Sequence, residues 1–159
     1  MQTEKKKKKG AGVTTLISDE TDFKSTTFRK DKEGHYIMIK GSSQQEELAI
    51  LNIYSPNTEA PRSITSPSWP MKIFRHTIML GDFNIPLTLL DQSLTQKSND
   101  EILYLNLTLN QLDLKDMHRM LYQSTTNYTF FSSAHRTYSK INYMLDHKAS
   151  LNKFKKLKL

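Results

Sequence analysis

Residues 77–84 read TIMLGDFN, in which a short apolar strand runs into a glycine and then into a carboxylate and a carboxamide. Residues 77–80 predict a buried β-strand that ends at Gly81. Asp82 and Asn84 are two residues apart, so in an extended backbone their side chains project together. A carboxylate can hold Mg²⁺ or orient a water, and an amide can bond a phosphate oxygen. Alone, the tetrapeptide more often marks a turn at a strand end, because Asp and Asn are common turn formers.

Strand-like segments lie on both sides of this stretch. Residues 48–54 are nearly continuous in apolar side chains, which predicts a strand buried on both faces, and they stop at the turn signal Pro56-Asn57. Further strands are predicted at Val13–Ile17, Tyr36–Ile39, Tyr128–Ser132 and Tyr138–Leu145.

One helix is clear from the sequence. Ser98 and Glu101 fit a capping box, and Ile102, Leu105, Leu109 and Leu112 then fall on one helical face. A second helix is predicted near residues 114–121, and the prolines of residues 59–70 predict an irregular loop. A chain of mostly β segments with one or two helices indicates an α+β fold or a layered α/β sandwich.

The composition limits the class of protein. The chain has 159 residues, enough for one domain, and it has no cysteine, so disulfides and thiolate metal sites are excluded. No apolar run approaches the ~20 residues of a membrane span, and lysines rather than an apolar stretch follow Met1. We expect an intracellular protein, nuclear or cytoplasmic, with no membrane partner.

The positive charge is concentrated at the two ends of the chain. The formal net charge is +7, and blocks of lysine occupy residues 5–9 and 153–158. Residues 1–10 are of low complexity and are predicted to form a disordered basic tail. Such blocks are either solvated tails or elements for nuclear import or DNA anchoring. The charge balance favours a polyanionic partner.

Other segments match the residues around Asp82 in a recognisable order. Tyr54 and Asn57 stand at the end of the preceding strand, and YTFFS (128–132) and YSKIN (138–142) follow downstream. With the segments DKEGHYIM (31–38) and QQEEL (44–48), this series resembles the endonuclease domain of long-interspersed-element (non-LTR) retrotransposons. That domain belongs to the endonuclease/exonuclease/phosphatase family, which includes the abasic-site repair endonucleases. The likeness runs over residues 11–155.

The resemblance implies a fold and a reaction. The fold would be a four-layered α/β sandwich with two packed β-sheets, and the reaction a Mg²⁺-dependent hydrolysis that nicks DNA and leaves a 3′ hydroxyl. By similarity, Asp82 would hold the metal and orient the attacking water. Asn84 would contact the scissile phosphate and help to hold Asp82, and Tyr54 would donate its hydroxyl to that phosphate.

The resemblance also implies a DNA-facing rim. Asn57 and Thr129 would line it, and Ser139 and Lys140 would lie in the stretch that leads to a DNA-contacting strand. The simpler interpretations are structural: Tyr54 as a strand-end aromatic and Thr129 as an ordinary strand residue. We expect Phe130 and Phe131 in the core. The histidines at positions 35, 76, 118 and 135 form no metal-ligand spacing and are expected to be structural or exposed.

The sequence departs from the family in four places. The family's early Asn and metal-binding Glu precede Ala11 in register, and Glu4 is no substitute for them. The family's final Ser-Asp-His lies past the matched region, and Asp146-His147 comes too early to replace it, so we interpret it as a chance pair. Asn142 stands where the family has Asp, and it cannot ionise. The Pro-rich residues 59–70 stand where the family has an amphipathic helix.

These departures favour a degenerate fragment. We expect a partial domain that lacks N-terminal and C-terminal strands of the sandwich. Its function would be that of a retrotransposon-derived, Mg²⁺-dependent DNA endonuclease with impaired catalysis, and its parent polyprotein would carry a reverse transcriptase. The alternative is a non-catalytic, basic nucleic-acid-binding remnant. An active nuclease, or a basic interaction module without nuclease ancestry, agrees less well with the sequence. DNA is the expected partner, and no small-molecule cofactor is expected.

Overall fold

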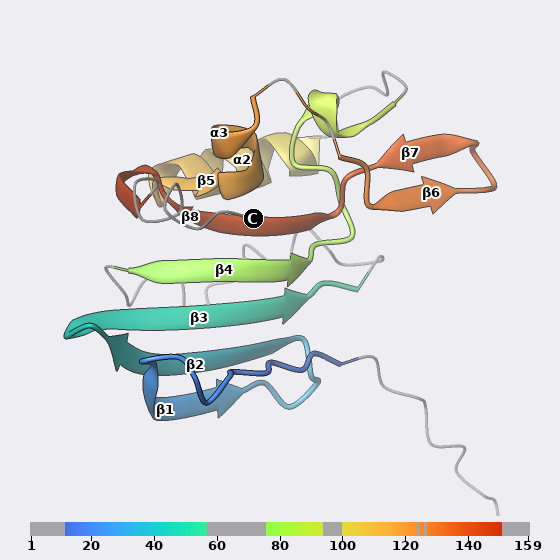
Figure 1. Ribbon diagram of the computed structural model, residues 1–159. Coiled ribbons are helices and arrows are strands. Elements are labelled where there is room, and N and C mark those ends of the chain that lie inside the picture. Colours follow the sequence, from blue (N-terminus) through green and yellow to red (C-terminus); the bar gives the residue numbers. More distant parts are fainter. Residues whose placement is uncertain (1–11, 57–75, 94–99, 124, 126, 151–159) are drawn as a thin grey trace, which may run out of the picture.

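The computed structural model describes residues 12–56, 76–93, 100–123, 125 and 127–150 (Figure 1). A six-stranded sheet has the order β1-β2-β3-β4-β8-β5. Its strands are β1 (Lys24–Lys30), β2 (Tyr36–Ser43), β3 (Glu46–Tyr54), β4 (Thr77–Asp82), β5 (Leu114–Asp116) and β8 (Asn142–His147). A separate hairpin contains β6 (Phe130–Ser132) and β7 (Thr137–Ser139).

The sheet is mixed, and its single parallel pair is central to the site. β1, β2 and β3 run antiparallel to one another, and β8 is antiparallel to both β4 and β5. β3 and β4 run parallel, in register from Ala49 against Thr77 to Tyr54 against Asp82. The two strands therefore bring their carboxyl ends to the same edge of the sheet.

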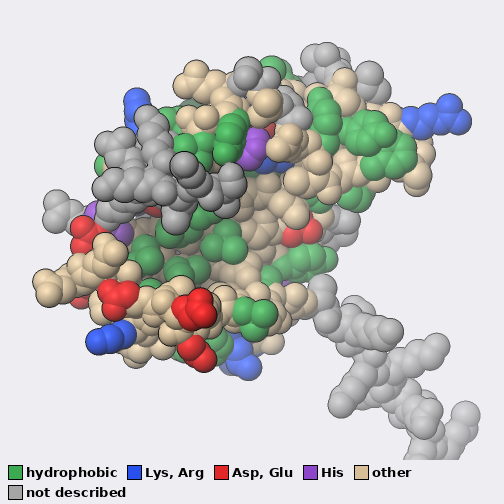
Figure 2. All heavy atoms as spheres, in the orientation of Figure 1, with side chains coloured by type: hydrophobic (Ala, Val, Ile, Leu, Met, Phe, Trp, Pro, Cys, Tyr) green, Lys and Arg blue, Asp and Glu red, His purple; other side chains and the backbone are tan. Residues whose placement is uncertain are grey.

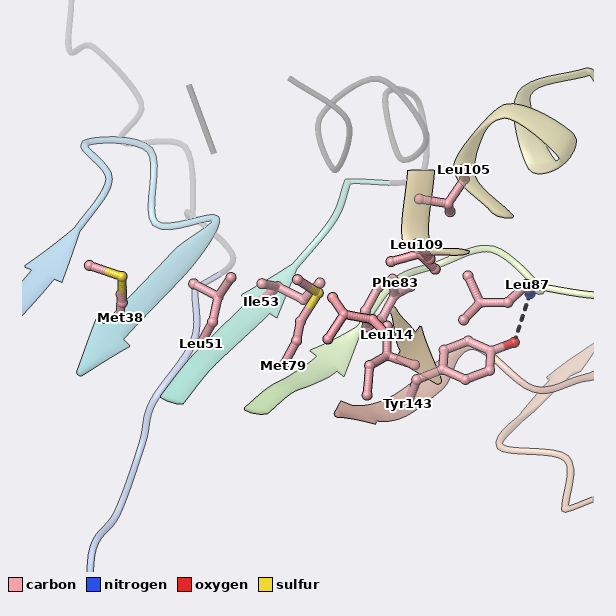
Figure 3. Close-up of a cluster of buried hydrophobic side chains, with 11 residues drawn as sticks. Met38, Leu51, Ile53, Met79, Phe83, Leu87, Leu105, Leu109, Leu114 and Tyr143 are labelled. Carbon is pink, nitrogen blue, oxygen red and sulfur yellow. Dashed lines mark hydrogen bonds between the residues drawn. The ribbon is translucent and has the colours of Figure 1, made fainter. Parts of the chain in front are cut away.

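The core lies between one face of the sheet and helix α2 (Asp100–Gln111) (Figure 3). Along β3, Ala49, Leu51 and Ile53 are almost completely buried, whereas the alternate residues Ile50 and Asn52 are only partly buried. The expectation of a strand buried on both faces was therefore wrong. Side chains of α2 cover one face, and the opposite face is partly exposed. The core contains Met38, Leu51, Ile53, Met79, Phe83, Leu87, Leu105, Leu109, Leu114, Tyr143 and Leu145.

The predicted helix is confirmed as α2, with Leu105 and Leu109 on its buried face. The proposed capping box lies outside what is described, since Ser98 and the side chain of Glu101 are not among the described groups. The basic tail 1–10 and the Pro-rich loop 59–70 also lie outside the described residues. Among the described residues there is one large sheet, and the second packed sheet that the resemblance implied is not found there.

Two predictions at the start of the chain were wrong. Val13–Ile17 does not form a strand. Instead, the Thr14 carbonyl accepts a hydrogen bond of 2.9 Å from the side chain of Asn52. This segment is therefore held by a side-chain contact and not by the backbone hydrogen bonds of a sheet. β1, with sequence KSTTFRK, was not predicted, because it is a polar edge strand exposed along its whole length.

Later segments were predicted with the wrong boundaries. Residues 138–145 form parts of two strands, β7 and β8, in different sheets, because the chain leaves the ladder at Lys140. Residues 114–121 form the short strand β5 and then helix α3 (Met117–Leu121). Phe130 and Phe131 are not in the core: they are 49% and 48% exposed, because the hairpin stands apart from the main sheet (Figure 1).

Candidate active site

The site begins with three residues aligned across neighbouring strands. Tyr54, the last residue of β3, is the register partner of Asp82, the last residue of β4. Asp82 is in turn the register partner of Asn142, the first residue of β8. Register partners on adjacent strands project from the same face of a sheet. The structure therefore brings a phenol, a carboxylate and a carboxamide together at one edge.

Gly81 permits the close approach that places Asp82. Its φ of +136° lies in a region that side-chain-bearing residues rarely adopt. A Cβ at this position would lie 2.0 Å from the backbone oxygen of Ile53 on β3. Only glycine allows β3 and β4 to meet this closely just before their polar ends.

Asn84 lies in the turn that follows β4. Its φ is +54°, a left-handed conformation that Asn tolerates better than most residues. Its backbone N–H donates to Asp82 Oδ1 at 2.9 Å, and its side-chain Nδ2 donates to the Ser55 carbonyl at 2.6 Å. The turn thus fixes the Asp82 carboxylate and ties the carboxamide of Asn84 to the end of β3.

Thr129 connects the hairpin to this edge of the sheet. Its Oγ1 accepts hydrogen bonds from the backbone N–H groups of Ile141, at 3.0 Å, and of Asn142, at 3.2 Å. Its own N–H donates to the carbonyl of Ser139 on β7. Thr129 and Ser139 therefore hold the chain that places Asn142 opposite Asp82. Asn57, the remaining rim residue, lies outside the described residues.

The side chain of Lys140 lies inside the protein, whereas the resemblance implied a residue in a DNA-contacting stretch. It is 6% exposed, and its Nζ is 2.5 Å from Asp116 Oδ2 and 5.0 Å from the centre of the Tyr143 ring. Its backbone N–H donates to the carbonyl of Asp91, whose carboxylate pairs with Arg119 at 2.6 Å. The carboxylate of Asp116 neutralises the ammonium of Lys140. The buried Lys140 therefore holds the segment between β7 and β8 in place.

Tyr143 contacts the same segment between β7 and β8 from the side of the core. Its hydroxyl donates to the Lys140 carbonyl at 2.6 Å and accepts from the Leu87 N–H at 2.9 Å (Figure 3). Burial, together with the nearby carboxylate of Asp91, raises the pKa of the Tyr143 hydroxyl far above its ordinary value. No sequence pattern predicted the long-range contacts of this network, because Leu87 is 56 residues from Tyr143 and Asp116 is 24 residues from Lys140.

Asp146 and His147 lie at the opposite end of β8, next to β5. Asp146 is four positions along the strand from Asn142, which corresponds to about 13 Å. The Asp146 carboxylate is buried and accepts from the His147 N–H and from the Ser150 hydroxyl. Burial raises its pKa above the ordinary aspartate value. The two residues therefore lie away from the alignment of Tyr54, Asp82 and Asn142.

The described residues at this edge do not fit a self-sufficient Mg²⁺ site. Asp82 supplies a carboxylate, but its paired neighbour Asn142 is neutral and Asn84 is an amide. Within the described parts of the chain, the group of three His, Asp or Glu side chains close enough to share an ion is elsewhere, at residues 31–35. A lone carboxylate is a poor match for Mg²⁺, which gives up its waters reluctantly.

The hairpin carries exposed aromatic side chains. The rings of Phe131 and Tyr138 are 4.7 Å apart, those of Tyr128 and Tyr138 are 5.9 Å apart, and all three residues are about half exposed. Figure 2 shows hydrophobic side chains gathered on this end of the molecule. Arg136 lies in the turn between the two strands. Phe131, one of these exposed aromatic residues, had been predicted to lie in the core.

None of the helices among the described residues is long and apolar enough to span a membrane.

The fold is that of the endonuclease/exonuclease/phosphatase class, as comparison with solved structures shows. A 3′ phosphatase, NExo from Neisseria bound to a product DNA hairpin, aligns with a TM-score of 0.61 at 18% identity, covering 82% of this chain and 61% of that one. The endonuclease domain of TRAS1, a telomere-specific non-LTR retrotransposon, aligns with a TM-score of 0.55 at 12% identity, covering 84% and 60%.

A third structure agrees. The catalytic domain of APE2 from Xenopus laevis aligns with a TM-score of 0.52 at 19% identity, covering 77% of this chain and 48% of that one. The chain therefore spans about half to three fifths of the length of these structures. At such identities the likeness establishes the fold, and no model of a known protein family matches the chain.

Proposed function

We propose that this chain is a retrotransposon-derived DNA endonuclease domain fragment that keeps a phosphate-facing site but has impaired catalysis. The observation that carries the proposal is the alignment of Tyr54, Asp82 and Asn142 across β3, β4 and β8. The ordered sequence motifs support a non-LTR origin, and with it a parent polyprotein that carries a reverse transcriptase inside the cell.

The proposed chemistry depends on three groups. The hydroxyl of Tyr54 would donate to a phosphate oxygen, and the amide of Asn84 would contact the same phosphate. Asp82, held by the Asn84 N–H, would orient a water for attack. Removing one such stabilising group commonly lowers the rate about 10²–10³-fold. Since Asn142 is neutral where a second carboxylate would help, we expect turnover at background level.

A plasmid-nicking assay tests this proposal. The purified chain, supplied with Mg²⁺, is expected to relax supercoiled DNA no faster than Asp82→Ala does. Nicking that the Asp82→Ala substitution abolishes would show an active enzyme and overturn the impaired state. Nicking that persists in Asp82→Ala points to a contaminating nuclease, which a second purification removes before the comparison is repeated.

The exposed aromatic hairpin favours a second candidate function, non-catalytic binding of nucleic acid. Aromatic faces stack on unpaired bases with about 1–3 kcal/mol per base, and cationic side chains attract the phosphates. The neighbouring rings of Phe131 and Tyr138, tilted by 38° to each other, lie in the same hairpin as Arg136 and match this pattern.

Fluorescence anisotropy with labelled single-stranded DNA separates the two functions. We expect the double variant Phe131→Ala/Tyr138→Ala to bind roughly 5- to 100-fold more weakly than the parent. Tyr104→Ala is the matched control, because Tyr104 is a similarly exposed aromatic residue on α2, away from the hairpin. Equal losses in both variants, or none in the hairpin variant, contradict a stacking role. Affinity that falls steeply with salt indicates the charge contribution.

A further inference from the structure

The turn between β1 and β2 brings together three side chains of metal-ligand type. Asp31, Glu33 and His35 alternate along the chain, and one ligand atom from each lies within 4.8 Å of the others. His35 Nδ1 is 3.4 Å from Asp31 Oδ2 and 3.4 Å from Glu33 Oε2. From the sequence alone, His35 was expected to be structural or exposed, because the histidines at positions 35, 76, 118 and 135 form no metal-ligand spacing.

The two separations suit a shared ion better than direct hydrogen bonds. An N–H···O hydrogen bond has a preferred length of about 2.9–3.0 Å, so 3.4 Å is long. Around a tetrahedral ion with ligand bonds of about 2.0–2.1 Å, neighbouring ligand atoms lie roughly 3.3–3.4 Å apart. The imidazole is therefore correctly spaced from both carboxylates, whose own oxygens lie within 4.8 Å of each other and would be drawn to the same spacing by an ion.

The turn is already held in place by other contacts. Asp31 Oδ1 accepts the His35 backbone N–H at 2.6 Å, which leaves Oδ2 directed at the imidazole. The His35 carbonyl accepts the Tyr54 N–H at 2.7 Å, which ties the turn to the end of β3. The side chains of Asp31 and His35 are 22% and 23% exposed and that of Glu33 is 76% exposed, so the outer side is open to water ligands.

We propose that Asp31, Glu33 and His35 bind one divalent transition-metal ion of the zinc type, with water completing its coordination. One imidazole and two carboxylates suit such ions, whereas Mg²⁺ and Ca²⁺ prefer ligand sets made only of oxygen. The site is separate from Asp82 and does not depend on the proposed nuclease function. The chain has no cysteine and only five histidines, so few other groups compete for the ion.

Calorimetric titration of the full chain with Zn²⁺ tests the proposal. We expect one ion per chain, and at least about tenfold weaker binding in Glu33→Gln and His35→Gln. Glu33→Gln is the decisive variant, because this exposed side chain is not among the contacts that hold the turn. His135→Gln, on the hairpin, and Asp82→Asn, at the candidate active site, are controls expected to bind like the parent.

The proposal is overturned if no Zn²⁺ binds, if Mg²⁺ binds equally well, or if Glu33→Gln and His35→Gln bind like the parent. The last outcome would mean an adventitious ion only.

Discussion

Tyr54 and Asp82 end two parallel strands at the same register position, so a phenol and a carboxylate lie next to each other on one face of the sheet. Parallel pairing produces this arrangement, because both strands reach the edge at their carboxyl ends. Antiparallel β8 then adds Asn142 beside Asp82. Three residues separated by 28 and by 60 positions in the sequence become neighbours through strand order alone.

Substitution of Gly81 by alanine should destabilise the fold by about 2–4 kcal/mol, since it combines an unfavourable φ with a steric clash. The new Cβ would meet the Ile53 backbone oxygen, which cannot move without separating β3 from β4. Chemical denaturation monitored by circular dichroism measures the loss. Gly12→Ala is the control, because a Cβ there has no atom within 4 Å. Similar stability of the two variants contradicts this account of Gly81.

Asn142→Asp should make stability depend on magnesium. Without a divalent cation, two carboxylates directly opposite each other repel and cost up to about 1 kcal/mol. With Mg²⁺ present, the pair offers two oxygen ligands, and the loss should reverse. Thermal unfolding with and without Mg²⁺ measures this difference, and Asn142→Ala is the uncharged control. A Mg²⁺ response in the parent chain as large as that of Asn142→Asp counts against an incomplete site.

Loss of one partner of the buried ion pair should be costlier than loss of both charges. Lys140→Met leaves the carboxylate of Asp116 buried and unpaired, which should cost about 3–5 kcal/mol. Adding Asp116→Asn removes that charge and keeps an oxygen that can accept the His118 N–H at the start of α3. We expect the double variant to be more stable than Lys140→Met in urea unfolding. Additive losses would show that the two residues are not coupled.

The raised pKa of Asp146 predicts a pH-dependent stability. The folded protein binds the proton of this buried carboxyl more tightly than the unfolded chain does, so the favourable contribution is complete below the ordinary aspartate value of 3.8. It is lost as the pH rises through the higher folded value. Asp146→Asn keeps a side-chain oxygen for the His147 N–H and the Ser150 hydroxyl, and should therefore gain stability relative to the parent as the pH rises.

Denaturation of the parent and of Asp146→Asn from about pH 4 to 6 tests this expectation. Asp19→Asn, at an exposed position, is the control for general charge effects. A stability difference between parent and Asp146→Asn that does not change with pH rules out this effect of burial.

Local patterns were sufficient for part of the fold and of the site. The apolar run before Gly81 predicted β4, the spacing of Leu105 and Leu109 predicted α2, and the position of Tyr54 at a strand end was predicted correctly. These signals work because alternation, helical periodicity and turn chemistry depend on residues only a few positions apart. The role of Asp82 could be suggested only together with the ordered motifs around it.

Tertiary structure decided where the charged and aromatic side chains lie. Lys140 lies within residues 138–145, which were predicted to form one strand, yet its side chain is buried because its ammonium pairs with the carboxylate of Asp116, 24 residues away. Phe130 and Phe131 are apolar, yet they are about half exposed, because no layer formed by the described residues covers their hairpin. Ion pairing and burial depend on which distant segments lie in contact, and strand order and register determine those contacts. For the same reason the sequence supplied the residues of the candidate site, whereas their alignment at one edge came from the pairing of β3, β4 and β8.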